Sequence, residues 1–191
     1  METLSRLKKL KKQTFTLAEA RSVDVSPPML TYLVRKGLIE RRTQGLYAFP
    51  EAAPIDLPDT IKELLKVIPR AIVGHSTALY LYGLTDELPG DIELLVPDRN
   101  APKRRQTGVR TYRVRADMKR IRVRSIEGIP VTTIEQTIID LLRKGAPLSR
   151  LIETFRLAQR KRLKPSLTEL TKIAADFRAK GRAKVLVEAL L

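Results

Sequence analysis

The feature that most constrains this chain is the order of helix caps near its N-terminus. Thr16 and Glu19 form a Thr-x-x-Glu capping box, which predicts a short helix that begins after Thr16. Ser26 followed by Pro27 predicts a second helix start, because serine caps free N–H groups and proline suits the first turn. Gly37 stands where a left-handed residue would end that helix. Two short helices in close succession are therefore expected.

A basic segment precedes these two helices, and a hairpin follows them. Leucines at every third position predict one apolar stripe on a first helix at residues 4–12. Residues 38–42 and 46–49 are expected to form two short strands around a glycine-containing turn at 43–45. Three helices and a hairpin in this order predict a winged helix-turn-helix over residues 1–50.

The third predicted helix can face outward with polar side chains while its apolar stripe packs on its own domain. Leu30, Leu33 and Val34 form that stripe. A helix that enters the major groove needs long or polar side chains on its other face. The residues expected to contact DNA are Ser26, Pro28, Thr31, Tyr32, Arg35 and Lys36 in the helix, and Arg41, Arg42, Thr43 and Gln44 in the wing. The alternative interpretation is a solvated amphipathic helix beside a hairpin.

The charge of the chain favours a polyanionic partner. The formal net charge is +16 at pH 7, and each Lys or Arg set against a phosphate releases condensed counterions. Residues 1–50 hold ten Lys and Arg against four Asp and Glu. Residues 99–124 hold eleven Lys and Arg against Asp117 alone. The sequence thus has two basic zones, one in each of two expected domains.

Composition excludes several classes of protein. A hydrophobic content of 43% with 30% charged residues describes a globular chain without a run long enough to span a membrane. The chain has no cysteine, which excludes disulfides and thiolate chemistry, and its one histidine cannot form a histidine metal cluster. We expect a cytoplasmic protein that needs no cofactor and no metal and has no membrane partner.

The rest of the chain predicts a second domain of mixed type. Prolines at 50, 54 and 58 indicate a linker at residues 51–58, and the α+β domain is expected at residues 59–191. The strands are expected at 91–96, 109–115, 120–126 and 129–132. The helices are expected at 59–68, 76–84, 133–145, 148–163, 166–180 and 182–191, the last three forming a helical tail. Thr133 with Gln136 predicts a second capping box.

An enzyme is one alternative. Asp91 and Glu93 alternate on a predicted strand after a Gly-His-Ser turn, a spacing with which nucleotidyltransferases hold Mg²⁺ and phosphates. The turn is off the usual pattern, and the third carboxylate has only Glu127 as a candidate. The same strand also fits a plain change from polar to core positions, so the sequence favours no catalytic residue.

A second nucleic-acid contact is the other alternative. Arg120, Arg122 and Arg124 alternate with Ile121 and Val123, which predicts an arginine face on one strand with the apolar residues inward. That face would bind flanking DNA or RNA, or would be a solvated outer surface. A basic RNA-binding protein remains open on this ground.

Several stretches resemble AbiEi-type antitoxins, the antitoxins of type IV toxin–antitoxin systems. In the first domain the similar stretches are Phe15–Ala20, Val25–Pro27, Leu33–Arg41 and Gly45–Pro50. In the second domain they are His75–Leu79, Tyr82–Leu84, Leu94–Pro97 and Ile129–Leu142. One departure is Gln136, at a position where the family often has arginine.

The resemblance implies an antitoxin that represses its own operon. Its winged domain would bind inverted repeats in double-stranded promoter DNA, an arrangement that admits two copies of the chain per operator. Its second domain would counteract a cognate toxin of the nucleotidyltransferase type, without the need for a stable complex.

Overall fold

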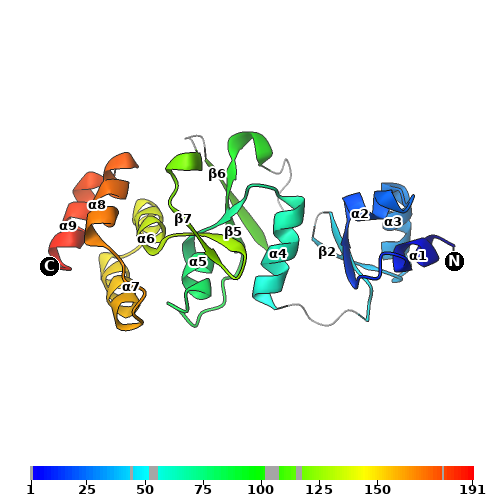
Figure 1. Ribbon diagram of the computed structural model, residues 1–191, viewed down its shortest axis with the longest axis horizontal. Coiled ribbons are helices and arrows are strands. Elements are labelled where there is room, and N and C mark those ends of the chain that lie inside the picture. The colour runs from blue at the N-terminus through cyan, green and yellow to red at the C-terminus, as the bar shows by residue number, and fades with distance from the viewer. Residues whose placement is uncertain (1, 44, 52–55, 102–107, 115–117, 178) are drawn as a thin grey trace. The chain divides into compact units, whose positions relative to one another are not determined.

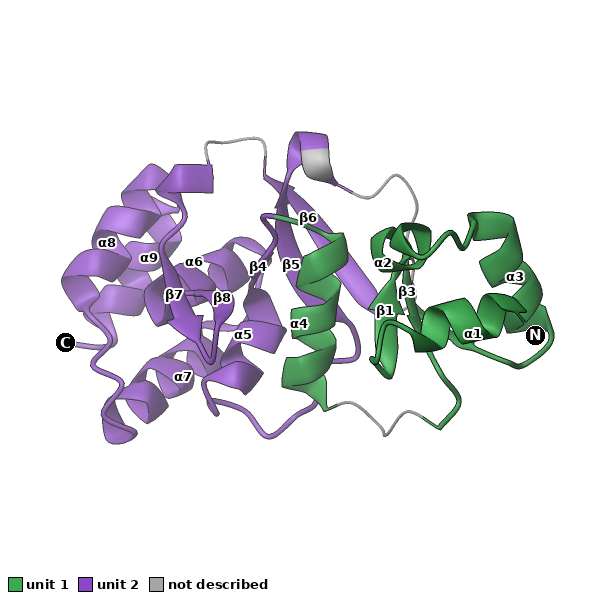
Figure 2. Ribbon diagram, turned by 45° about the vertical axis from the view of Figure 1, so that its right-hand side comes forward, with its two compact units in different colours: residues 1–69 green, residues 70–191 purple. Residues whose placement is uncertain are grey.

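The computed structural model describes residues 2–43, 45–51, 56–101, 108–114, 118–177 and 179–191. Their contacts divide the chain into two compact units, residues 1–69 and 70–191 (Figure 2). Each unit combines helices with a sheet, which confirms the α+β class. The helix at 57–67 groups with the first unit, whereas the expected boundary assigns most of it to the second domain. The boundaries at 50 and 59 stay a prediction.

The first unit contains a three-stranded sheet and four helices within its described residues (Figure 1). The elements are α1 (Glu2–Lys8), β1 (Thr14–Thr16), α2 (Leu17–Ser22), α3 (Pro27–Arg35), β2 (Glu40–Thr43), β3 (Leu46–Ala48) and α4 (Leu57–Val67). The strand order is β1-β3-β2, and both pairings are antiparallel. Helices α1 to α3 and the hairpin confirm the winged helix-turn-helix; β1, which closes the sheet, was not predicted.

The helix caps near the N-terminus behave partly as expected. The Thr16 N–H donates to the Glu19 carboxylate at 2.7 Å, and the Glu19 N–H donates to the Thr16 hydroxyl at 3.2 Å, so the capping box is confirmed. Gly37 has the expected left-handed φ of 68°. Ser26 is the N-cap of α3 but makes no side-chain cap hydrogen bond. The expected serine cap is therefore wrong, and proline in the first turn marks this helix start.

An aromatic group anchors the core of the first unit. Phe15 on β1 is fully buried and stacks on Tyr47 of β3, with ring centroids 5.9 Å apart. The ring centroid of Phe49 lies 5.6 Å from that of Phe15. Leu30 and Leu33 of α3 pack into this cluster, which confirms the predicted apolar stripe and fixes which face of α3 is left to solvent.

The second unit places a five-stranded mixed sheet beside a group of helices (Figure 1). The strands are β4 (Ile72–Val73), β5 (Ile92–Pro97), β6 (Val109–Val114), β7 (Val123–Ile126) and β8 (Ile129–Thr132), in the order β6-β5-β4-β8-β7. The helices are α5 (His75–Leu81), α6 (Ile134–Arg143), α7 (Leu148–Arg160), α8 (Leu167–Asp176) and α9 (Lys180–Glu188). Two short 3-10 turns, η1 (Asp98–Asn100) and η2 (Met118–Arg120), lie between strands. Strand β5 pairs in parallel with β6 and antiparallel with β4.

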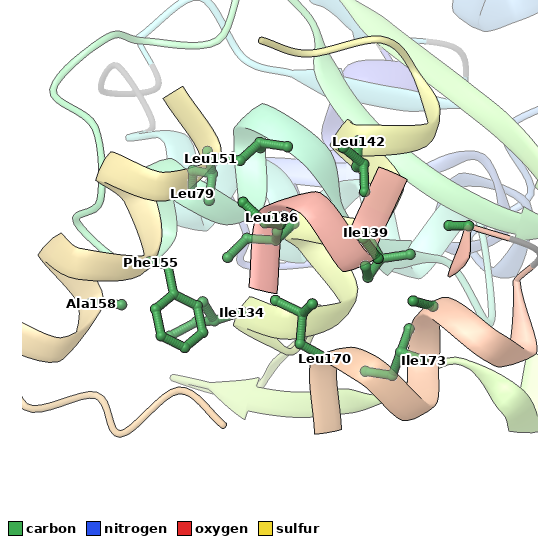
Figure 3. Close-up of a cluster of buried hydrophobic side chains, with 14 of the residues drawn as sticks. Leu79, Ile134, Ile139, Leu142, Leu151, Phe155, Ala158, Leu170, Ile173 and Leu186 are labelled. Atoms are coloured by element: carbon green, nitrogen blue, oxygen red, sulfur yellow. The ribbon is translucent and has the colours of Figure 1, made fainter. Parts of the chain in front are cut away.

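The helices of the second unit enclose its main core. Buried side chains from α5 to α9 meet in one cluster, in which Phe155 of α7 packs near Leu170 of α8 and Leu186 of α9 (Figure 3). Ile138, Ile139 and Leu142 of α6 are fully buried in the same cluster. The predicted helical tail is thus part of the core. Across the described ranges, no helix has the length and apolar character needed to cross a bilayer.

Candidate functional site

Helix α3 presents one continuous exposed face. Pro28, Thr31, Tyr32 and Arg35 follow the spacing i, i+3, i+4, i+7, so they share one side of the helix, and all four are exposed. Tyr32 is 54% exposed, which is high for so large an aromatic side chain. The predicted residues Ser26 and Lys36 at the two ends are exposed as well, and so is the neighbouring Met29.

The side chains of this face differ in the groups that they offer to a ligand. The Thr31 hydroxyl donates to the Pro27 carbonyl at 3.1 Å, so it offers an acceptor and a methyl group outward rather than a donor. The Lys36 ammonium lies 5.9 Å from the centroid of the Tyr32 ring, a cation–π distance. Arg35 remains the guanidinium of the face, with the fork geometry that suits a guanine edge or a phosphate.

The wing contributes exposed arginines. Arg41 and Arg42 on β2 are both exposed, and Arg42 forms a 3.2 Å ion pair with Glu40 on the same strand. The register of β2 against β3 shifts between Arg41 and Thr43, which marks a bulge beside the turn. The side chain of Thr43 and all of Gln44 lie outside the described residues.

The predicted arginine face at residues 120–126 is not a single strand. Arg120 ends η2, and β7 begins only at Val123. Val123 is 42% exposed, not inward, whereas Ile121 is buried against Ile72 and Leu95. The prediction is therefore right for Ile121 and wrong for Val123, because the residues before Val123 are not part of the strand that pairs with β8.

The three arginines are consequently in different settings. The guanidinium groups of Arg120 and Arg122 lie 3.6 and 3.5 Å from the carboxylate of Asp176 on α8. Arg122 also donates to the Arg120 carbonyl at 3.0 Å. Arg124 is exposed on β7. Two of the three charges are therefore partly compensated by one carboxylate.

Glu93, a candidate metal ligand by sequence, is the centre of a hydrogen-bond network. One carboxylate oxygen accepts from the Ser76 N–H at 2.8 Å, and the other accepts from the Tyr112 hydroxyl at 2.7 Å and the Lys144 ammonium at 3.0 Å. Burial alone would raise the pKa of Glu93, but the bonds from Tyr112, Lys144 and Ser76 hold it below its ordinary value. Both oxygens are thus engaged by the protein.

The other two carboxylates of that hypothesis are separate from this network. Asp91 precedes β5 and forms a 3.0 Å ion pair with Arg110 on β6. Glu127 is exposed in the turn between β7 and β8, with a left-handed φ of 49°. The structure therefore does not present Asp91 and Glu93 as a free pair of carboxylates on one strand face.

A pocket of about 470 Å³ opens beside the Glu93 network. Its lining includes His75, Tyr112 and Asp140, and His75 and Asp140 are each only 5% exposed. The His75 Nδ1 and the Asp140 Oδ2 atoms are buried without a hydrogen-bond partner among the described residues. His75 also has a left-handed φ of 54°, a conformation that is uncommon for a residue with a side chain. Orphaned polar atoms and backbone strain coincide at this pocket.

The N-terminal residues of the first unit are similar in sequence to a known family. Residues 2–50 match the sequence model of a family described as transcriptional regulators, AbiEi antitoxin. Residues 2–50 are therefore similar to an AbiEi antitoxin domain. This match confirms the resemblance in the part of the chain that contains α1 to α3 and the wing, and it supports a general role as antitoxin and regulator.

A solved structure is similar in fold over more of the chain than residues 2–50. The RV2827C protein from Mycobacterium tuberculosis matches over 97% of this chain and 74% of its own, with a TM-score of 0.62 and 17% sequence identity. At that identity the likeness concerns the fold alone. A comparison with curated proteins gives no match.

The pocket of the second unit was not predicted from the sequence. Its polar residues come from α5, β6 and α6, and no local pattern joins them. One signal was present: Gln136 and Asp140 are four residues apart in a predicted helix, so they lie on one side of it. The Gln136 side chain donates to Asp140 at 3.2 Å and accepts from the Arg122 N–H at 3.3 Å. It does not complete the predicted capping box, although Thr133 accepts from the Gln136 N–H as expected.

Acidification is expected to separate two variants of this pocket. Burial raises the pKa of Asp140 from 3.8 to about 6, so its charged form opposes folding near pH 7 and protonation stabilises the fold as pH falls from about 6 to 4. Burial and the nearby Lys144 lower the pKa of His75 from 6.5 to about 4, so stability is lost over nearly the same interval. Relative to wild type, Asp140→Asn should lose stability on acidification, and His75→Gln should gain it.

Each difference should reach about 2–3 kcal/mol, since one pKa unit corresponds to about 1.4 kcal/mol. The measurement is the free energy of unfolding in urea at several pH values between 4 and 7. Parallel pH profiles for the wild type and both variants would contradict the shifted pKa values of Asp140 and His75.

Proposed function

We propose that this chain is a DNA-binding transcriptional repressor and the antitoxin of a type IV toxin–antitoxin system. The observation that supports this most is the exposed face of Pro28, Thr31, Tyr32 and Arg35, which lies on α3 within the residues that match the AbiEi antitoxin family. The wing adds Arg41, Arg42, Thr43 and Gln44 to the proposed contact. Base edges would be read by α3, and the wing would hold the backbone or the minor groove.

The proposed operator is an inverted repeat in the chain's own promoter. A helix-turn-helix reads one half-site, so two copies related by a two-fold axis would occupy one operator. The proposed partner of the second unit is a nucleotidyltransferase-type toxin, counteracted without a stable complex. The site of action would be the cytoplasm, with the promoter DNA.

We also propose that the chain is not an enzyme. Support comes from Glu93, whose two oxygens are engaged by Ser76, Tyr112 and Lys144, and from Asp91, which pairs with Arg110. A nucleotidyltransferase site would need these carboxylates to be available to Mg²⁺ and phosphates.

The test is binding of the full chain to its own promoter against a scrambled duplex of equal length. Specific DNA-binding proteins prefer their site by about 10³-fold or more, and fluorescence anisotropy at a stated salt concentration measures that ratio. Equal affinity for the two duplexes would contradict the repressor. Co-expression with the toxin encoded beside the chain should restore growth, and continued arrest would contradict the antitoxin.

A reversal of Arg120, Arg122 and Arg124 to Glu separates the second basic zone from the first. If those residues touch phosphates only, the reversal should weaken promoter and scrambled DNA by equal factors, because phosphate contacts carry no sequence information. Loss of the promoter preference itself would contradict the assignment of specificity to α3. An effect confined to toxin neutralisation would assign the three arginines to antitoxicity.

A further inference from the structure

The pocket of the second unit has a buried end and an open end of different chemistry. At the buried end, His75 and Asp140 are each 5% exposed. At the open end, the side chains of Arg113 and Arg143 are 59% and 50% exposed. A ligand that fills the pocket would therefore meet cations at the mouth and neutral or hydrogen-bond-accepting groups at the buried end.

The buried end lacks hydrogen-bond partners. One oxygen of Asp140 accepts from the Gln136 side chain at 3.2 Å, while Oδ2 has no partner among the described residues. The buried Nδ1 atom of His75 also has no hydrogen-bond partner among the described residues. A buried polar atom without a partner is costly, so both atoms favour a ligand that supplies complementary groups. The edge of a nucleobase offers this, because it carries an amino or imino donor beside an acceptor.

The walls between the two ends suit a flat body. The ring of Tyr112 lies 4.2 Å from that of His75, and the Phe177 ring lies on the lining with apolar neighbours Leu95 and Ile121. Aromatic and apolar walls of this kind stack against a planar base. The volume of about 470 Å³ falls within the range of small-molecule sites.

The mouth carries cations with weak protein partners. The guanidinium of Arg113 is 3.8 Å from Asp98, and that of Arg143 is 3.8 Å from Asp140, both long for ion pairs. Arg143 also lies over the Phe177 ring, 5.6 Å from its centroid. A guanidinium group can donate a forked pair of hydrogen bonds to a phosphate group.

We propose that this pocket binds a nucleoside phosphate, with the amino group of the base on Asp140 and the phosphate between Arg113 and Arg143. Every residue that carries the proposal belongs to residues 70–191. The site is thus separate from the DNA-reading face, and the proposal stands whether or not the chain is a repressor.

Calorimetric titration of the full chain with AMP, GMP and CMP tests the site. At least one of them should bind with a dissociation constant below about 1 mM, while its nucleoside and inorganic phosphate should each bind at least about tenfold more weakly. Absence of binding by all three nucleotides would overturn the proposal. Inorganic phosphate that binds as tightly as the nucleotides would overturn it as well, because the mouth alone would then account for binding.

Variants assign the two ends. Asp140→Asn keeps the shape but replaces an acceptor with a donor, so affinity for the nucleotide should fall by about tenfold or more. Arg113→Ala should lower nucleotide affinity by a similar factor and leave nucleoside affinity unchanged. The matched control is Arg110→Ala, which removes an exposed arginine from the same strand outside the pocket.

Equal affinities in Arg113→Ala and Arg110→Ala would contradict the phosphate end. Unchanged affinity in Asp140→Asn would contradict the base end. If thermal melting shows that Asp140→Asn does not fold, the Arg113 and Arg110 pair still decides the outcome, because both side chains are on the surface.

Discussion

Replacement of Arg35, Lys36, Arg41 and Arg42 together by alanine is expected to reduce promoter affinity by about a thousandfold near 0.1 M salt. Each lost phosphate contact lowers the exponent of the salt dependence by about 0.9 through counterion release. A lost contact of Arg35 to a base edge would cost about 1–3 kcal/mol instead. Arg42 is paired with Glu40 and should contribute less than Arg41. Anisotropy titrations at several salt concentrations measure both the affinity and the slope.

The matched control removes the same charge from the second unit. Alanine at Arg160, Lys172, Lys180 and Lys184, all exposed, lowers the net charge equally without touching α3 or the wing. This control should weaken promoter binding only slightly, since it leaves every predicted contact of α3 and the wing in place. An equal loss in both quadruple variants would show that total charge, not the predicted face, determines binding.

Glu93→Ala is expected to destabilise the second unit by about 3–5 kcal/mol, because it leaves the Lys144 ammonium, the Tyr112 hydroxyl and a backbone N–H without their acceptor. Asp91→Ala is the matched control two residues away. It removes an ion pair with a half-exposed arginine and should cost less than about 1 kcal/mol. Urea unfolding followed by far-ultraviolet circular dichroism measures both values.

The same pair of variants distinguishes a structural from a catalytic role. Below the unfolding temperature of the weaker variant, both should keep the promoter affinity of the wild type. Metal-dependent nucleotide transfer by the wild type that either variant abolishes would favour the enzyme instead. Similar stability losses for Asp91→Ala and Glu93→Ala would contradict the role of Glu93 as the centre of the hydrogen-bond network.

The parts of the fold that were predictable depend on neighbours in the sequence. The capping box of Thr16 and Glu19 is made within four residues, and the left-handed Gly37 needs only its own lack of a side chain. Strands β1 and β4 escaped prediction because they are three and two residues long and exist only through pairing with distant strands. The alternation at 120–126 was right for Ile121, which is buried, and wrong for Val123, which is exposed, because a 3-10 turn occupies residues 118–120 and β7 begins only at Val123.

The candidate site shows the same division. The outward face of α3 followed from the apolar stripe of Leu30 and Leu33, because a helix with one buried side has its other side determined. The pocket could not be predicted in that way, since Tyr112 and Lys144 reach Glu93 from residues 19 and 51 positions away. A buried acid such as Glu93 resembles a catalytic one in sequence until its partners are known.

The pairing of β1 with β3 affects how the first unit folds. Thr14 lies opposite Ala48, and Thr16 lies opposite Leu46, so one closed loop contains α2, α3 and β2. During synthesis α3 therefore leaves the ribosome before β3, and the sheet on which it packs is incomplete until β3 follows. Closing this loop gives its contacts a long sequence separation, which slows folding relative to local contacts. We therefore expect α3 and the wing to reach their native arrangement together, once β3 pairs with β1.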